Sequence, residues 1–198
     1  MKEIILASKS VYRKQLLERL GIAFTCSESD FDETPLKKSI KDPVELTQKL
    51  AIAKAQKVQM LHNHAIIIGS DQVCYHNGKV LGKTGSIDKS FEQLKSMQGS
   101  THELITSYCI LFDGQEIVRT NITKLEMRKL SDLQIKNYLS SDNPVDCAGS
   151  YKLELNGISL MSNIETSDYT AIIGLPLVCL ANDLNKIGVL VPPEMEGV

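Results

Sequence analysis

Three consecutive isoleucines followed at once by polar residues are the feature that most restricts the fold. The run Ile66-Ile67-Ile68 leads directly into Gly69-Ser70-Asp71-Gln72. An uninterrupted apolar run of this length is typical of a buried strand, and open α/β sheets place their ligand sites where such strands end. The sequence therefore predicts an α/β protein with a polar site just beyond residue 68.

Capping residues mark where helices begin and end. Ser10 precedes the first helical pattern and Gly21 closes it, and Asp42-Pro43 begins a second helix that runs towards Leu61. Residues 30–35 are expected as an acidic loop. The remaining expected helices span residues 88–97 with Asp88 as the cap, 131–139 with a capping box, and 176 to about 187.

Strand patterns alternate with these helices. Asn77-Gly78 and Asp113-Gly114 each separate two extended runs, as hairpin turns do. Strands are expected over residues 4–6, 66–68, 104–112, 117–127 and 171–173. Since the chain has no internal repeat and no low-complexity linker, it is predicted to be one α/β domain over residues 1–190 with a flexible tail over 191–198.

Composition and charge argue against several classes of protein. Hydrophobic residues make up 42% of the chain, yet no segment approaches the roughly 18 apolar residues of a membrane span, and the N-terminus lacks a signal-peptide pattern. We therefore expect a cytoplasmic protein with no membrane partner. The 5 cysteines are scattered without a CxxC pair, which favours neither disulfides nor a zinc site. A net charge of -2 provides no broad positive field for nucleic acid.

Two polar segments in the N-terminal part are candidate ligand sites. In the turn over residues 7–13, Ser8 and Arg13 could hold phosphate oxygens together with backbone N–H groups. The more common roles are helix capping for such a serine and a solvated helix face for such an arginine. The acidic segment 30–35, which includes Glu33, could supply oxygen ligands to Mg²⁺ or Mn²⁺. A solvated acidic turn is the alternative for that segment.

Two further candidates lie later in the chain. Asp71 directly follows the apolar run, where an aspartate could hold a metal ion, accept a proton from water or serve as a structural turn residue. Residues 147–154 form a small-residue turn leading into Lys152 and Glu154, which could instead be an exposed salt-bridged strand. His102 is expected to be structural, because the 4 histidines show no metal-ligand spacing.

At these same residues the sequence resembles the Maf family of nucleotide pyrophosphatases, whose fold is similar to that of the inosine-triphosphate pyrophosphatases. The sequence departs from the family pattern at Thr84, where the family often has proline. This difference should alter the stiffness of the loop. The matching segments follow the family's order from residue 4 to about 184, and they are 6–10 with Arg13, 32–34, 54–55, 69–73, 82–83, 99–106, 148–151 and 174–177.

The resemblance implies a mixed central β-sheet flanked by helices, with a cleft between two lobes. It also implies a hydrolase that cuts a nucleoside triphosphate between the α- and β-phosphates, with Asp71 as proton acceptor and with Mg²⁺ or Mn²⁺ anchored by Glu33 and Asp71. The residues implied to line the phosphate and metal site are Ser8, Arg13, Glu33, Lys54 and Lys83.

Three residues point to a 7-methyl-GTP branch of that family. Gln72 and Glu154 match this branch, and Tyr12 keeps an aromatic ring where the branch often has tryptophan. Methylation at N7 gives guanine a positive charge that favours an aromatic face, and a carboxylate can accept from the N1–H and the amino group of guanine. These residues are expected to select the base.

Other functions stay open at this point. They are a dTTP/UTP pyrophosphatase of the same family, a nucleotide-binding inhibitor of septum formation with little turnover, and a nucleic-acid-binding module. The acidic net charge argues against the last of these. The expected partner is a nucleoside triphosphate, with no stable nucleic acid and with a homodimer left open.

Overall fold

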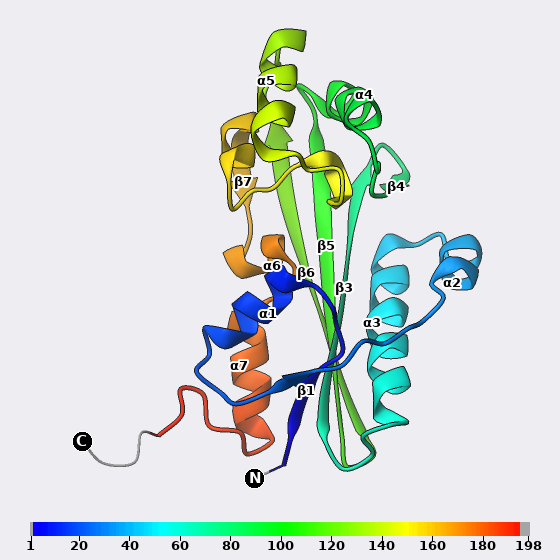
Figure 1. Cartoon of the computed structure of the whole chain (residues 1–198), viewed down its shortest axis with the longest axis vertical. Helices are drawn as coiled ribbons and strands as arrows, with labels where there is room; N and C mark the ends of the chain where they lie inside the picture. Colours follow the sequence, from blue (N-terminus) through cyan, green and yellow to red (C-terminus); the bar gives the residue numbers. More distant parts are fainter. Residues whose placement is uncertain (1, 195–198) are drawn as a thin grey trace. The chain divides into compact units, whose positions relative to one another are not determined.

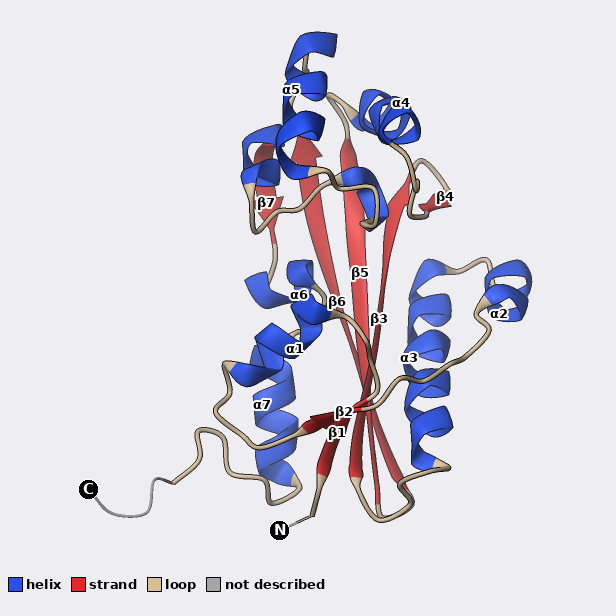
Figure 2. Ribbon diagram, in the orientation of Figure 1, coloured by secondary structure: helices blue, strands red, loops and turns tan. Residues whose placement is uncertain are grey.

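A computed structural model describes residues 2–194 and shows seven strands and seven α-helices in them (Figures 1 and 2). The strands are β1 (Ile4–Leu6), β2 (Thr25–Cys26), β3 (Ile66–His76), β4 (Lys79–Leu81), β5 (Thr101–Phe112), β6 (Gln115–Met127) and β7 (Met161–Glu165). The helices are α1 (Val11–Glu18), α2 (Thr34–Ser39), α3 (Pro43–Gln59), α4 (Ile87–Met97), α5 (Asp132–Asp142), α6 (Tyr169–Ile173) and α7 (Leu177–Lys186), with short 3₁₀ turns η1 (Ala148–Ser150) and η2 (Asn156–Leu160).

The seven strands form one mixed sheet, which confirms the predicted fold class. The strand order is β2-β1-β3-β5-β6-β7, and β4 pairs with β3 beside this path. Strand β1 is parallel to both β2 and β3, whereas the β3–β4 and β6–β7 pairs are antiparallel. The apolar runs 4–6 and 66–68 are therefore direct neighbours, with Ile5 opposite Ile67.

The chain divides into two compact units. The first unit contains residues up to Asp71, residues 106–121 and the chain from Asp168 onwards, and the second unit contains residues 72–105 and 122–167. Strands β3, β5 and β6 each contribute residues to both units. The division falls directly after Asp71, so the site residues predicted from sequence are distributed over both units.

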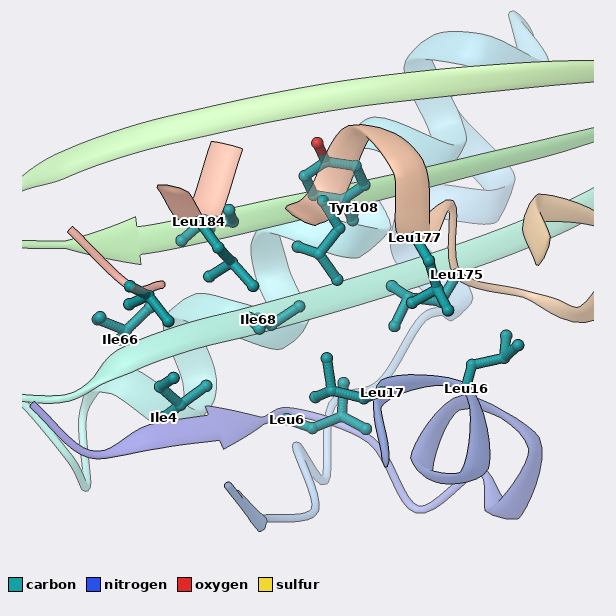
Figure 3. Packing of buried hydrophobic residues seen from close by; sticks show 13 residues of the cluster. Ile4, Leu6, Leu16, Leu17, Ile66, Ile68, Tyr108, Leu175, Leu177 and Leu184 are labelled. Atoms are coloured by element: carbon teal, nitrogen blue, oxygen red, sulfur yellow. The ribbon is translucent and has the colours of Figure 1, made fainter. Parts of the chain in front are cut away.

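The first unit has three layers, because β1 and the start of β3 are apolar on both faces. Alternate residues of β1 enter different cores: Ile4 and Leu6 pack with Leu17, whereas Ile5 packs with Ala55. Figure 3 shows the core on the side of α1 and α7, and Figure 1 shows α3 on the opposite side of the sheet. The two-sided burial explains why the strands are uninterrupted apolar runs.

The second unit contains residues 72–76 of β3, 101–105 of β5 and 122–127 of β6, and its helices α4 and α5 pack against each other. Leu94 and Met97 of α4 and Ile135 and Leu139 of α5 are buried. The turn between β3 and β4 has left-handed φ values of 47° at Asn77 and 77° at Gly78, which confirms the predicted hairpin.

Most predicted helix starts are confirmed, and one cap is wrong. The side chains of Ser10 and Asp42 cap α1 and α3, and Ser131 forms the predicted capping box of α5. Helix α4 is capped by Ser86 rather than Asp88. The hydroxyl of Ser86 accepts from the backbone N–H of residue 89 at 3.4 Å, which places Asp88 in the first turn.

Three segments differ from their expected structure. Residues 171–173 belong to helix α6 instead of a strand, because Asp168 caps the segment by accepting from the backbone N–H of Thr170 at 2.9 Å. The acidic segment 30–35 is not all loop, since α2 begins at Thr34. Residues 147–154 form η1 and a turn, not a strand, with Gly149 at a φ of 79°.

The C-terminal segment is partly described. The side chain of Asn185 bonds both backbone groups of Val191, donating to its carbonyl at 2.7 Å and accepting from its N–H at 3.0 Å. Residues 195–198 of the predicted tail lie outside the described residues. Within residues 2–194, none of the helices is long and apolar enough to cross a membrane.

Candidate functional site

Two carboxylates of the first unit share one ammonium group. Lys54 Nζ lies 2.6 Å from Glu33 Oε1 and 2.5 Å from Asp71 Oδ1. The side chains of Lys54 and Asp71 are only 13% and 9% exposed. Glu33, Lys54 and Asp71, which are far apart in the sequence, therefore form one compact charged cluster.

Close packing of α3 on β3 brings Lys54 next to Asp71. A Cβ atom added at Gly69 would lie 2.3 Å from the carbonyl oxygen of Ala51 and 2.9 Å from the backbone N of Ala55, so a side chain at position 69 would push the helix away. Lys54 precedes Ala55 in this helix, and Asp71 lies two residues after Gly69 in the strand. Gly69 thus sets the distance between the two elements that carry the charges.

Glu33 is held by two lysines. It occupies the N-cap position of α2 and contacts Lys37 as well as Lys54, with Lys37 Nζ at 2.5 Å from Oε2. Burial raises the pKa of Glu33, but the hydrogen bonds and charges of Lys37 and Lys54 outweigh it and lower the pKa to about 2. Glu33 is therefore ionised at neutral pH and can bind a cation.

Arg13 lies in the first turn of α1 and is directed by a backbone carbonyl. Its Nε donates to the carbonyl oxygen of Gly174 at 3.0 Å, and the hydroxyl of Ser70 lies 3.0 Å from the same oxygen. Burial lowers the pKa of Arg13, and the negative charges of Asp71 and Glu33 oppose this effect. An arginine still stays protonated, so Arg13 adds a fixed positive charge to the cluster.

Ser8 shapes the turn between β1 and α1. Its Oγ accepts from the backbone N–H of Ser10 at 3.1 Å, and the backbone N–H of Ala7 donates to the carbonyl of Ile68 at 2.8 Å. The hydroxyl proton of Ser8 can still be donated to a ligand. Tyr12 follows in α1 and is half-buried.

The second unit carries the other predicted site residues. Gln72 follows Asp71 in β3, Lys83 is exposed in the loop between β4 and α4, and Glu154 is exposed in the turn after η1. In the Lys83 loop the Thr84 hydroxyl lies 2.5 Å from that of Ser90, a contact that restrains the loop.

His102 is a buried residue of the second unit. Its Nε2 lies 2.8 Å from the hydroxyl of Tyr151, and burial, together with the charge of His76, lowers the pKa of His102 to about 4. A neutral, hydrogen-bonded histidine agrees with the structural role expected for it. Gly149 packs against the Tyr151 ring, with its ideal Cβ position 2.8 Å from Tyr151 Cε1.

Comparison with known proteins identifies the family. A family model described as Maf, Maf-like protein, matches residues 3–187. The chain belongs to the Maf family. Among its relatives, a protein of Bdellovibrio bacteriovorus is 42% identical over 93% of this chain and 97% of its own length. A protein of Pseudomonas savastanoi pv. phaseolicola is 40% identical over 97% of this chain and 100% of its own length. Both relatives are named 7-methyl-GTP pyrophosphatase.

A partial likeness to a solved structure was also found. The Staphylococcus aureus Ham1 protein matches with a TM-score of 0.46 and 17% sequence identity, covering 64% of this chain and 72% of that chain.

The structure of this Maf protein brings together four of the predicted site residues, namely Arg13, Glu33, Lys54 and Asp71. Sequence reasoning did not identify Ser70, Lys37 or the carbonyl of Gly174 as parts of the site. Ser70 and Gly174 lie in matched Maf segments, but a backbone carbonyl that directs an arginine leaves no signal in residue type. Lys37 had a weak signal, its i,i+4 spacing from Glu33.

Proposed function

We propose that this Maf protein hydrolyses a nucleoside triphosphate between the α- and β-phosphates and that it prefers 7-methyl-GTP. The products are the nucleoside monophosphate and pyrophosphate. The observation that carries the proposal is the contact of Glu33 and Asp71 with one shared ammonium group, that of Lys54, close to the charge of Arg13. The match to the Maf family over residues 3–187 supports the same reaction. The names of relatives about 40% identical support the substrate.

The carboxylate pair fits a divalent cation. Glu33 and Asp71 each direct an oxygen at the same point, which the Lys54 ammonium occupies. Within residues 2–194, no group of three His, Cys, Asp or Glu side chains could hold a metal by itself. Since Mg²⁺ takes about six oxygens, water and phosphate oxygens would supply the rest. A bound Mg²⁺ or Mn²⁺ would neutralise phosphate charge and activate water.

The remaining charges suit the triphosphate. Arg13 presents a planar guanidinium that is held in place through its Nε, and such a group can donate to phosphate oxygens with its terminal nitrogens. In this proposal Ser8, Lys54 and Lys83 supply further donors to the phosphates. These donors stabilise the negative charge that accumulates on the departing pyrophosphate.

Asp71 is the proposed proton acceptor. Its carboxylate contacts the Lys54 ammonium and is largely shielded from solvent, with a residue exposure of 7%. A shielded carboxylate that accepts a proton from water makes the oxygen of that water a better nucleophile towards the α-phosphorus.

The first prediction concerns the products. Incubating the protein with 7-methyl-GTP and Mg²⁺ or Mn²⁺ should release pyrophosphate and 7-methyl-GMP in equal amounts, because the proposed attack is on the α-phosphorus. Chromatography of the nucleotides with a coupled pyrophosphate assay measures both products. Chelation of the divalent cation should stop the reaction. Orthophosphate as the primary product, or binding without turnover, would contradict the proposal.

The second prediction concerns the base. Tyr12→Ala should reduce the preference for 7-methyl-GTP over GTP by several-fold, because about 0.5–2 kcal/mol of cation–π attraction is lost. Steady-state kcat/KM values for the two nucleotides measure this preference.

Glu154→Gln serves as a matched comparison, since it should weaken both guanine nucleotides alike. The amide can accept only through one oxygen, whereas the carboxylate accepts two donors through two oxygens. In this proposal Gln72 shapes the same base pocket. A wild-type protein with equal kcat/KM for 7-methyl-GTP and GTP, or one that favours dTTP or UTP, would overturn the base assignment and leave the pyrophosphatase proposal standing.

A further inference from the structure

Lys54 has a different environment from the one expected of a phosphate ligand. Its ammonium is not directed at open solvent but is bonded to Glu33 Oε1 at 2.6 Å and to Asp71 Oδ1 at 2.5 Å. The side chain of Lys54 is 13% exposed, and those of Asp71 and Glu33 are 9% and 29% exposed, so the contact with Asp71 is the better shielded of the two. Lys54 is therefore engaged by the two carboxylates proposed to hold the metal.

The electrostatics of the cluster set Lys54 and a divalent cation in competition for the same two oxygens. Two carboxylates that face one point repel each other, and a single cation placed between them compensates both. The ammonium of lysine is a compact charge, whereas a divalent cation needs carboxylate oxygens at about 2.0–2.1 Å and repels a nearby ammonium. A divalent cation that binds Glu33 Oε1 and Asp71 Oδ1 would therefore displace Lys54 from these two oxygens.

We propose that Lys54 holds the two metal-binding carboxylates together and competes with the divalent cation for them. This inference rests on the proposed metal-dependent function. Lys54 is then a positioning residue that keeps the carboxylates of Glu33 and Asp71 together. On entry of the cation its long side chain is released and can bind a phosphate group instead.

This exchange couples the cation to the nucleotide. The nucleotide-free protein binds a divalent cation weakly, because the cation must displace Lys54. A triphosphate offers the displaced ammonium a new anionic partner, so the cation and the nucleotide each increase the affinity for the other.

Direct titration of the nucleotide-free, full-length protein with Mn²⁺ tests the exchange. Isothermal titration calorimetry should show that Lys54→Gln binds Mn²⁺ about tenfold or more tightly than the wild type, because the competing charge is gone. Lys37→Gln is the matched control. Lys37 also contacts Glu33, at 2.5 Å, but it is 51% exposed. Its removal deletes the same charge and leaves Lys54 in place, so it should change Mn²⁺ affinity by only about threefold or less.

Thermal melting provides a readout that does not depend on activity. Lys54→Gln should melt at a lower temperature than the wild type without metal, because its carboxylates then repel each other, and Mn²⁺ should restore it. Lys54→Met, which keeps the apolar stem, should behave in the same way. If these variants fold only with metal, recovery of a cooperative transition on addition of Mn²⁺ supports the exchange, and no recovery overturns it.

The outcomes separate this inference from the proposed reaction. Lys54 variants that fold and bind Mn²⁺ no more tightly than the wild type would overturn the exchange, even if the wild type releases pyrophosphate. A protein that releases no pyrophosphate, but whose Lys54 variants gain Mn²⁺ affinity, would refute the reaction and keep the exchange.

Discussion

Asp71→Asn should lower the turnover number for pyrophosphate release by about a hundredfold or more while the protein stays folded. Asparagine has nearly the same shape but cannot accept a proton from water and is a weaker metal ligand. The fold should survive, because Lys54 keeps its contact with Glu33 at 2.6 Å. Steady-state kinetics with 7-methyl-GTP and a thermal melting curve measure the two parts of the prediction.

Asp32→Asn is the matched control for Asp71→Asn. Asp32 is exposed, and its carboxylate accepts from the backbone N–H of Thr34 at 2.9 Å, a bond that asparagine can also make. It should therefore keep a turnover number close to that of the wild type. An Asp71→Asn protein with wild-type turnover and a wild-type melting curve would exclude Asp71 from the chemistry.

Asp183→Asn should lower the free energy of unfolding at neutral pH by about 2–3 kcal/mol. Asp183 of α7 is 1% exposed and accepts from Tyr108 Oη at 2.8 Å, Arg119 Nε at 2.9 Å and Lys186 Nζ at 2.8 Å. The amide nitrogen of asparagine would face one or more of these donors and leave them unpaired. Urea unfolding at pH 7 measures the loss.

The pH dependence gives this stability prediction a second test. Burial raises the pKa of Asp183, but the bonds from Arg119, Lys186 and Tyr108 lower it to about 2, below the ordinary value of 3.8. As the pH falls, the unfolded chain is protonated first. The stabilisation is therefore complete above about pH 4 and is lost as the pH falls towards 2.

The difference in unfolding free energy between the wild type and Asp183→Asn should accordingly shrink between pH 4 and pH 2. Tyr108→Phe is the control, because it removes one of the three donors and leaves the carboxylate ionised and paired with Arg119 and Lys186. It should cost about 1–2 kcal/mol. A difference between the wild type and Asp183→Asn that is constant over this pH range would show that the charge of Asp183 does not contribute.

The sequence by itself determined the elements whose signals are local. The caps at Ser10, Asp42 and Ser131 and the hairpin turn at Asn77-Gly78 depend on backbone geometry that a few neighbouring residues set. The apolar runs at 4–6 and 66–68 identified two strands of a covered sheet, because burial on both faces requires apolar side chains throughout. Their pairing was shown only by the structure.

Local signals were insufficient where two structures compete for the same residues. Residues 171–173 have the composition of a short strand, yet Asp168 caps them as a helix and also accepts from the backbone N–H of Val178 at 2.8 Å. A contact with a residue ten positions away outweighs strand propensity here. Helix α2 was also missed. It has only 6 residues, and it begins inside an acidic segment whose composition is typical of a loop.

The candidate site was also predicted from the sequence only in part. The sequence placed Asp71 beyond a buried strand and, through the family resemblance, named Arg13, Glu33 and Lys54 beside it. Only the tertiary structure showed that Lys54 binds both carboxylates, that the Gly174 carbonyl directs Arg13, and that Asp183 is buried among three donors. These contacts join elements that chain folding brings together from distant parts of the sequence. The pairing of charges therefore depends on packing distances, such as the one that Gly69 sets between α3 and β3. Those distances cannot be predicted from which charged residues the sequence contains.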